Sequence, residues 1–376
     1  MGSRLTHRTL DLAILGTRGI PANYGGFETF AEELSTRLAR RGHHVTVYGR
    51  SHFVPPGVRD YRGVRIRVLP CIRRKYLDTV THTALSVLRA MFARHDAILI
   101  CNAANAFLAG LPALAGQKVL LNVDGIERQR RKWSALGRAA YHVGEFLATV
   151  LPDAVIADAA VIQRYYEQEH GFRTHFIPYG AAAEKVDTTE ALDRLGLTPH
   201  SYLLYVSRLE PENNADLVIA AYVQSSVSLP LVIVGDAPYS SRYIDSLRRQ
   251  AAGRNVIMPG AIYGSGYREL LSHCLCYIQA TEVGGTHPAL LEAMGAGALV
   301  IANDTPEHRE VLAHAGLTYR FNDPDSLALL MREVVCSPDE YKTLGARAQE
   351  RVKQCYDWES VADRYEKLFM ELVEAR

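Results

Sequence analysis

Gly284–Pro288 and Glu292 have the residue types and spacing of a site for an anion and a diol. Two glycines let a ligand approach the backbone closely, and Pro288 fits the first turn of a helix capped by Thr286 or His287. The free N–H groups of that helix suit a diphosphate, and a carboxylate one turn later suits the vicinal hydroxyls of a ribose. A glycine-rich turn before a core helix, with Glu292 in solvent, is the alternative.

A guanidinium is expected at the same edge of the same sheet. Arg208 follows the apolar run Tyr202–Val206, and Glu212 opens the next helical stretch. Arginine presents a planar, permanently charged fork that matches phosphate oxygens. The alternative is a surface ion pair of Arg208 with Glu210 or Glu212.

Two segments of the first half also carry candidate groups. The glycine-rich loop Gly16–Gly26 lacks the G-x-G-x-x-G spacing, and the next strand ends in Arg50 without the acidic residue that would hold an NAD ribose. These features argue against an oxidoreductase. Asp124 ends the apolar run Val119–Val123, where it either contacts a sugar hydroxyl, acts as a base or caps the following helix.

Short apolar runs that alternate with amphipathic helical stretches must position these groups. Runs of this kind are typical of parallel strands buried on both faces, so we expect an α/β fold of two Rossmann-like doubly wound parallel sheets that face each other across a cleft. The expected domains are 1–182, 183–356 and a C-terminal helix, 357–376, that crosses back to the first domain. The predicted strands are Leu10–Leu15, Val45–Tyr48, Ala97–Cys101, Val119–Val123, Ala154–Ala157, Tyr202–Val206, Leu231–Val234, Val256–Met258, Cys276–Gln279 and Leu299–Ala302.

The composition of the 376 residues excludes several classes of function. A net charge of +1 does not favour nucleic acid, and no run approaches the about 20 apolar residues of a membrane span. The N-terminus lacks an apolar signal region, so we expect a cytoplasmic protein. Cys274 and Cys276 lack partners for a metal site. The pair Asp323 and Asp325 is typical of a turn and a helix start. No metal or cofactor is therefore expected.

A basic stretch follows Asp124. It contains Arg128, Arg130, Arg131, Lys132 and Arg138 beside Trp133, and Arg73–Lys75 adds to the positive charge. Such a surface suits anionic lipid headgroups at the inner face of the cell membrane or a pyrophosphate. A solvated charged face is the alternative.

The chain resembles the retaining glycosyltransferases of family 4, which have the GT-B fold. More narrowly, it is similar to the subgroup with a DUF1972-type N-terminal domain, which includes bacterial β-1,4-rhamnosyltransferases. The resemblance covers nearly the whole chain. It is carried by Leu15–Pro21, Gly25–Glu28, Asn122–Glu127, Lys132, Trp133, Ile177–Gly180, Arg208–Asn214, Gly284–Thr286 and Leu290–Met294.

The resemblance implies roles for individual residues. Arg208 would hold the donor diphosphate, Glu292 would match the second glutamate of the E-x7-E motif and bind the ribose, and Ile262 and Tyr263 would lie at the base. Asp124, Arg208 and Glu212 form the implied catalytic set. The implied donor-binding residues are Gly25, Gly26, Arg208, Ile262, Tyr263, Gly285, Thr286, His287, Leu290 and Glu292.

The sequence also departs from the broad family pattern. Glycine stands at 284 in place of the first glutamate of E-x7-E, with Glu282 two residues early, and Asn213 stands where a lysine usually partners the arginine. His287 stands where asparagine is expected. The subgroup pattern shares the glycines and the Glu-Asn-Asn run.

The function implied by the resemblance is metal-independent transfer of L-rhamnose from dTDP-β-L-rhamnose, as substrate rather than cofactor, to a glycan or lipid-diphosphate-linked sugar in bacterial polysaccharide synthesis. Three alternatives stay open: a UDP- or GDP-hexose donor, a nucleotide-sugar 2-epimerase of the same fold, and a non-catalytic glycosyltransferase-like subunit. The residues themselves indicate only a nucleotide sugar.

Overall fold

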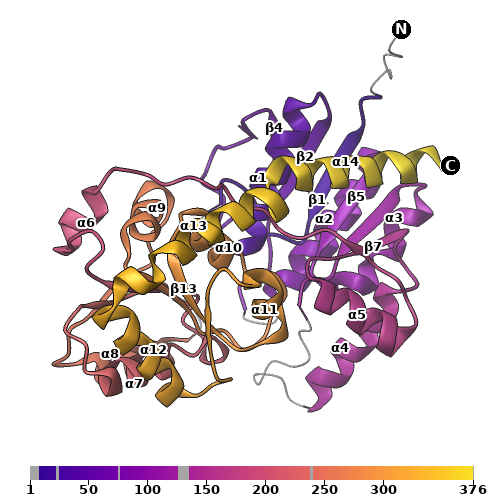
Figure 1. The fold of residues 1–376 in the computed structure, drawn as a ribbon. Coiled ribbons are helices and arrows are strands. Elements are labelled where there is room, and N and C mark those ends of the chain that lie inside the picture. Colours follow the sequence, from indigo (N-terminus) through magenta and orange to yellow (C-terminus); the bar gives the residue numbers. More distant parts are fainter. Residues whose placement is uncertain (1–7, 23–24, 75–76, 126–134, 238–239, 376) are drawn as a thin grey trace, which may run out of the picture. The chain divides into compact units, whose positions relative to one another are not determined.

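A computed structural model describes residues 8–22, 25–74, 77–125, 135–237 and 240–375 (Figure 1). The chain divides into two compact units. The described residues of Met1–Asp124, Trp133–Ile177 and Trp358–Arg376 form unit 1, and those of Gly125–Lys132 and Pro178–Asp357 form unit 2.

Unit 1 is built on an eight-stranded sheet in the order β3-β4-β2-β1-β5-β6-β7-β8. All neighbouring pairs are parallel except the short pair β3–β4. The central strand β5 has the sequence AILIC and is buried throughout, as expected for a strand covered on both faces. The strands are β1 (Asp11–Leu15), β2 (His44–Arg50), β3 (Asp60–Tyr61), β4 (Val64–Leu69), β5 (Ala97–Cys101), β6 (Lys118–Asn122), β7 (Ala154–Ala157) and β8 (His175–Phe176).

The helices of unit 1 connect these strands. The first, α1, carries Glu28 in its first turn and Arg37 and Arg40 in its last, which complements the helix dipole. The helical elements are α1 (Gly26–Arg40), α2 (Asp78–Ala93), η1 (Ala103–Leu108), α3 (Gly110–Leu114), α4 (Ala135–Ala148), α5 (Ala160–His170) and the C-terminal α14 (Trp358–Glu374).

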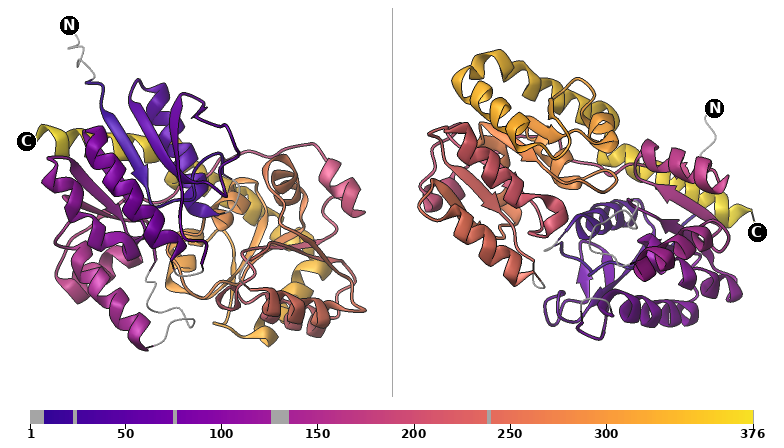
Figure 2. Two further views of the ribbon diagram at one scale, coloured as in Figure 1. Left: turned by 180° about the vertical axis from the view of Figure 1, so that it is seen from behind. Right: turned by 90° about the horizontal axis from the view of Figure 1, so that it is seen from below.

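The C-terminal helix α14 packs within unit 1. Tyr365 is fully buried, with its ring centroid 5.4 Å from that of Phe30, and its hydroxyl accepts a 2.9 Å hydrogen bond from Nδ2 of Asn122 at the end of β6. Arg41, just after α1, forms ion pairs of 2.8 and 2.7 Å with Glu359 and Glu366 of α14. Figure 2 shows α14, in yellow, beside α1 from further sides. Buried contacts and an ion-pair network therefore hold this helix on unit 1.

Unit 2 is built on a six-stranded, wholly parallel sheet in the order β11-β10-β9-β12-β13-β14. Its apolar core includes Leu203, Ile233, Ile278 and Ile301 from four neighbouring strands. The strands are β9 (Leu203–Val206), β10 (Leu231–Val234), β11 (Val256–Gly260), β12 (Cys276–Gln279), β13 (Leu299–Asn303) and β14 (Leu317–Tyr319). The helices are α6 (Glu190–Leu195), η3 (Pro211–Asn213), α7 (Ala215–Ser225), α8 (Ser241–Ala251), α9 (Gly264–His273), α10 (Pro288–Gly295), α11 (Pro306–Leu312), α12 (Pro324–Cys336) and α13 (Pro338–Cys355).

The predicted parallel α/β sheets are confirmed in both units. Every apolar run named above as a strand contains one in the structure, with ends that agree to within a residue or two. The prediction missed β3, β4, β8 and β14. In β4 the buried Val64 and Ile66 alternate with exposed arginines, so this strand lacks the continuous apolar run by which the others were identified.

One smaller prediction, the helix start at Asp323, is also confirmed. Asp323 is the N-cap of α12, where its carboxylate accepts the N–H groups of Asp325 and Ser326. Cys274 and Cys276 are buried free thiols. No helix in the described ranges combines the length and the apolar character needed to cross a bilayer.

Candidate functional site

The order in which strands are added to the sheet of unit 2 reverses between β9 and β12. The chain runs from β9 outward to β10 and β11, and then returns to the other side of β9 with β12. Open α/β sheets bind ligands outside the carboxyl ends of the strands at such a switch point. The loop after β9 carries Arg208, and the loop after β12 carries 280–287, so unit 2 brings both candidate segments to this edge.

The backbone around Arg208 is held from two sides. Its carbonyl oxygen accepts a 2.6 Å hydrogen bond from Nδ2 of Asn213 and a 2.8 Å bond from the N–H of Glu210. Behind the turn, a Cβ on Gly235 would lie 1.8 Å from the carbonyl oxygen of Ser207, so glycine is required for this approach. These contacts fix the direction in which the arginine leaves the sheet edge.

Arg208 is half-buried. Among the described residues it has no carboxylate within 4.0 Å and no side-chain hydrogen bond. The surface ion pair with Glu210 or Glu212 that was the alternative for this residue is therefore not formed. A partly desolvated cation without a protein partner is suited to an anionic ligand.

An amide network lies behind the two loops. Nδ2 of Asn214 donates to Oδ1 of Asn322 at 2.9 Å, and Nδ2 of Asn303 donates to the same oxygen at 2.8 Å. Nδ2 of Asn322 donates to Oε2 of Glu282 at 2.7 Å, and the N–H of Glu282 donates to the carbonyl oxygen of Glu212 at 3.2 Å. Glu282 and the buried Glu212 thus help to join the two loops.

Gly284 makes room for the side chain of His287. A Cβ at position 284 would lie 2.3 Å from Cε1 and 2.7 Å from Nε2 of that imidazole. The ring of His287 also packs on His308, with 5.0 Å between centroids. Gly284 stands at the position of the first glutamate in the family motif, and a larger residue there would clash with the imidazole of His287.

His308 is the buried neighbour in this ring pair. Its Nδ1 lies 2.8 Å from the carbonyl oxygen of Asn303, an acceptor, so Nδ1 carries the proton. Burial lowers the pKa of His308 to about 4. The imidazole is therefore neutral near pH 7 and adds no positive charge to the loop.

Helix α10 begins where the proline predicted it. His287 occupies the N-cap position with extended backbone but makes no capping hydrogen bond through its side chain, and Pro288 takes the first position. The N–H groups of Leu290 and Leu291 donate to the carbonyl oxygen of His287. Leu290 is fully buried, as Thr286 nearly is, so the side chain of Leu290 belongs to the core and can only shape the loop from behind.

Glu292 lies half-buried on α10 and is held by a tyrosine. The hydroxyl of Tyr267, on α9, donates a 2.7 Å hydrogen bond to Oε2 of Glu292. Burial, and then the nearby carboxylate, raise the pKa of Tyr267 well above its ordinary value, so the hydroxyl stays a donor. Sequence reasoning missed Tyr267; its only signal is its place one helical turn after Tyr263.

Ile262 and Tyr263 lie between β11 and α9. Ile262 is half-buried, and its Cγ2 would lie 3.2 Å from a Cβ on Gly266. The ring of Tyr263 is 49% exposed. Tyr263 precedes the helix that carries Tyr267, so the residues implied for the base and the residue that holds Glu292 come from one segment.

The glycine loop of unit 1 is held by a carboxylate. Gly25 is the N-cap of α1, and its carbonyl oxygen accepts the N–H groups of Glu28 and Thr29. Oε1 of the buried Glu28 accepts the N–H of Arg18 at 2.9 Å, and a Cβ on Gly25 would lie 3.2 Å from Oε2. Glu28 therefore orders the loop that contains Gly25 and Gly26.

Asp124 follows β6 of the same sheet. It is half-buried with φ 52°, and its N–H donates to Oδ1 of Asn122 at 3.0 Å. The alternative of a helix cap concerns 126–134, which lie outside the described residues. The basic residues Arg128, Arg130, Arg131 and Lys132, with Trp133 and Lys75, also lie outside them, as does the side chain of Arg138.

Comparisons with known proteins agree with this architecture. The model of the Glycosyltransferase Family 4 domain matches residues 24–185, and that of Glycosyl transferases group 1 matches residues 189–351. The chain is 24% identical over 271 residues to the lipopolysaccharide 1,2-N-acetylglucosaminetransferase of Salmonella typhimurium, covering 66% of this chain and 71% of that protein. It is 28% identical over 172 residues to the phosphatidylinositol N-acetylglucosaminyltransferase gpi3 subunit of Schizosaccharomyces pombe, covering 44% of this chain but only 37% of that protein.

Two solved structures show the same fold. The sucrose-phosphate synthase of Thermosynechococcus elongatus superimposes with a TM-score of 0.81 at 20% identity, covering 98% of this chain and all of that one. Anabaena HepE in complex with UDP-glucose gives a TM-score of 0.81 at 18% identity, covering 96% of this chain and all of that one. The chain therefore has the GT-B fold and two glycosyltransferase domains, a Glycosyltransferase Family 4 domain followed by a Glycosyl transferases group 1 domain.

Proposed function

We propose that the chain is an active retaining glycosyltransferase whose unit 2 binds the nucleotide diphosphate of a sugar donor. The observation that carries the proposal is the half-buried Arg208, which has no carboxylate partner among the described residues and follows β9 at the switch point. Glu292 follows the loop after the neighbouring strand β12 and supplies a carboxylate for the nucleoside.

In this proposal unit 2 acts mainly by holding the leaving group. Arg208 and the N-terminus of α10 stabilise the negative charge that develops on the diphosphate as the bond to the sugar breaks. The diphosphate accepts the proton of the acceptor hydroxyl on the same face, so the configuration is retained without a protein nucleophile. Gly285, Thr286 and His287 present backbone groups to the sugar, and no metal takes part.

Unit 1 takes the acceptor in this proposal. The ordered loop at Gly25 and Gly26 and the carboxylate of Asp124 follow strands β1 and β6, so both stand at the carboxyl end of the first sheet. Asp124 contacts an acceptor hydroxyl and orients it. The acceptor is a glycan or a lipid-diphosphate-linked sugar, reached at the inner face of the membrane, as the basic stretch after Asp124 supports.

The proposed donor is dTDP-β-L-rhamnose, which rests on the resemblance to the rhamnosyltransferase subgroup. A UDP-hexose is the second candidate, and two observations favour it. Anabaena HepE, of the same fold, was solved with UDP-glucose. The carboxylate of Glu292 also suits a ribose with two vicinal hydroxyls, whereas the deoxyribose of dTDP has only the 3′-hydroxyl.

Nucleoside diphosphate release from a panel of dTDP-, UDP- and GDP-sugars, with and without lipid-linked GlcNAc or glucose, tests the function. Arg208→Ala removes a charge-assisted contact of about 1.5–3 kcal/mol, so release should fall at least tenfold. Arg248→Ala is the matched control, because Arg248 is an exposed residue of α8 in the same unit. Equal rates in the two variants would remove Arg208 from the site.

The same assay separates the alternatives. Release from UDP-sugars but not from dTDP-rhamnose would refute the rhamnose donor. Epimer formation without acceptor would identify a 2-epimerase. If no donor is turned over and Glu292→Ala leaves nucleotide binding unchanged, the donor site proposed for unit 2 is refuted and the non-catalytic subunit is favoured.

A further inference from the structure

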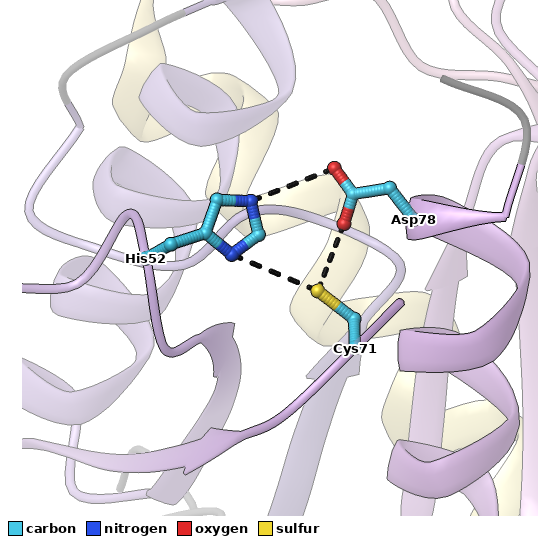
Figure 3. A group of neighbouring side chains, drawn as sticks. All are labelled: His52, Cys71 and Asp78. Carbon is cyan, nitrogen blue, oxygen red and sulfur yellow. Dashed lines mark hydrogen bonds and ion pairs between the residues drawn. The ribbon is translucent and has the colours of Figure 1, made fainter. Parts of the chain in front are cut away.

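Three potential metal ligands from separate segments meet in unit 1. His52 follows β2, Cys71 follows β4, and Asp78 is the first residue of α2. Figure 3 shows the imidazole, the thiol and the carboxylate turned toward one another. One ligand atom from each lies within 4.8 Å of the others.

The distances are those of a small coordination site. Sγ of Cys71 lies 2.9 Å from Oδ1 of Asp78 and 3.7 Å from Nδ1 of His52, and Nε2 of His52 lies 3.6 Å from Oδ2 of Asp78. Ligands about 2.0–2.3 Å from a tetrahedral ion stand about 3.5 Å apart. The imidazole offers only one of its two nitrogens to an ion, so the ring must shift slightly and the thiol–carboxylate pair must open. Nε2 of His52 is buried without a hydrogen-bond partner, so no hydrogen bond occupies this nitrogen.

Arg50 holds the carboxylate from behind. Its guanidinium forms a 3.0 Å ion pair with Oδ2 of Asp78 and donates to Oγ1 of Thr79 at 3.2 Å. The side chains of Arg50 and Asp78 are both almost fully buried. Oδ2 is therefore anchored while Oδ1 faces the thiol, which is the division expected when an outer group orients a metal ligand.

A catalytic cysteine does not explain this arrangement. Nucleophilic thiols have lowered pKa values and positively charged neighbours. Here the thiol of Cys71 is protonated, because it donates a hydrogen bond to the carboxylate of Asp78. A group with this protonation state becomes a strong ligand only when a cation replaces its proton.

We propose that His52, Cys71 and Asp78 bind a divalent, thiophilic cation, with zinc as the best fit. On binding, the S–H proton of Cys71 leaves to solvent and a metal–sulfur bond takes its place. A thiolate and an imidazole favour zinc over magnesium or calcium, and three protein ligands leave one tetrahedral position for water. The site is independent of the transfer proposed above, because it stabilises unit 1 and supplies no step to the reaction.

The charge balance permits such a site. A thiolate and a carboxylate offset the two charges of the ion, and Arg50 leaves a net excess of one positive charge. Arg18 and Arg73 add to the positive potential at His52. We therefore expect weaker binding than in a four-cysteine site. The ion would tie the segments after β2 and β4 to the start of α2.

Metal binding to the whole chain tests the proposal. Chelator-treated protein is titrated with Co²⁺ while the near-ultraviolet absorption from thiolate to cobalt is recorded, and with Zn²⁺ while the melting temperature is followed. Wild type should show the band and a Zn²⁺-dependent rise in melting temperature of several degrees. Cys71→Ser should abolish the band, and His52→Ala should weaken Co²⁺ binding at least tenfold.

Two control variants test whether the absorption band comes from the proposed site. Cys336→Ser removes an exposed thiol elsewhere and should leave the band intact. His142→Ala disrupts a second metal-ligand group, His142, Glu145 and His170, which has no sulfur and so cannot produce the band. X-ray absorption of the wild-type 1:1 zinc complex needs no variant and should show a single sulfur neighbour. No band in wild type, a band that survives in Cys71→Ser, or a zinc shell without sulfur overturns the proposal.

Discussion

Replacing Gly284 by alanine should damage unit 2 through one steric contact. The new Cβ would lie 2.3 Å from Cε1 of His287, far inside van der Waals contact. The backbone of Gly284 does not have a positive φ, so alanine brings no backbone strain of its own. Because the imidazole already packs on His308 at 5.0 Å, it must leave that contact or push the loop outward.

Overpacking of this kind costs about 1–3 kcal/mol. For a unit of this size the melting temperature should fall by about 2–4 °C per kcal/mol. Because His287 is also the N-cap residue of α10, the displaced loop should weaken binding of UDP or dTDP several-fold, which calorimetry would measure.

A double-mutant cycle separates steric from indirect effects. In Gly284→Ala/His287→Ala the imidazole is gone, so the added methyl group should cost little relative to His287→Ala alone. The coupling energy should then recover most of the loss seen in Gly284→Ala. Wild-type stability and nucleotide affinity in Gly284→Ala, or equal losses from the methyl group in both backgrounds, would refute the reasoning.

Two further predictions use contacts of the same unit. Tyr267→Phe removes the hydroxyl that donates to Glu292, so nucleotide affinity should fall about three- to tenfold. Tyr341→Phe, which removes a hydroxyl that contacts Glu333 elsewhere in unit 2, should leave the affinity unchanged. Unchanged affinity of Tyr267→Phe in titrations would argue against a positioning role. His308 has a folded pKa of about 4 against 6.5 in the unfolded chain, so the unfolded state binds the proton first as the pH falls. The free energy of unfolding should therefore drop by up to about 3 kcal/mol between pH 6.5 and 4. His308→Gln should make this pH dependence less steep in urea unfolding. His82, whose pKa is lowered to the same value, contributes a similar loss in both proteins.

The strands could be predicted because parallel strands buried on both faces leave a plain mark in the sequence. Ala97–Cys101 and Leu231–Val234 are continuous apolar runs, and the structure places strands at the same residues. The order of the strands within each sheet could not be predicted in this way, because it depends on crossover connections that leave no local pattern in the sequence. β4 could not be predicted from such a run, since the exposed Arg65 and Arg67 interrupt its apolar residues.

The candidate segments could be found for a related reason. Arg208 and Gly284–Glu292 each follow an apolar run, and parallel strands end at one edge of a sheet, so their proximity follows from the fold class. Tyr267 could not be found in this way, because it lies on a different helix and meets Glu292 only through packing. The group of His52, Cys71 and Asp78 was missed for the same reason: its members come from three segments with no characteristic spacing.

Two of the departures from the family pattern, at 213 and 284, favour an altered site over a lost one. Asn213, where a lysine is usual, donates a hydrogen bond from its side-chain amide to the carbonyl oxygen of Arg208 and so holds the backbone of this arginine in place. Gly284, where a glutamate is usual, provides the space that the imidazole of His287 fills. Each replacement makes a specific contact in the site, and a carboxylate at 284 could not coexist with the present position of His287. The absent groups therefore weaken the case for a non-catalytic subunit, and they predict a grip on the donor sugar that relies on backbone groups and His287 rather than on a glutamate.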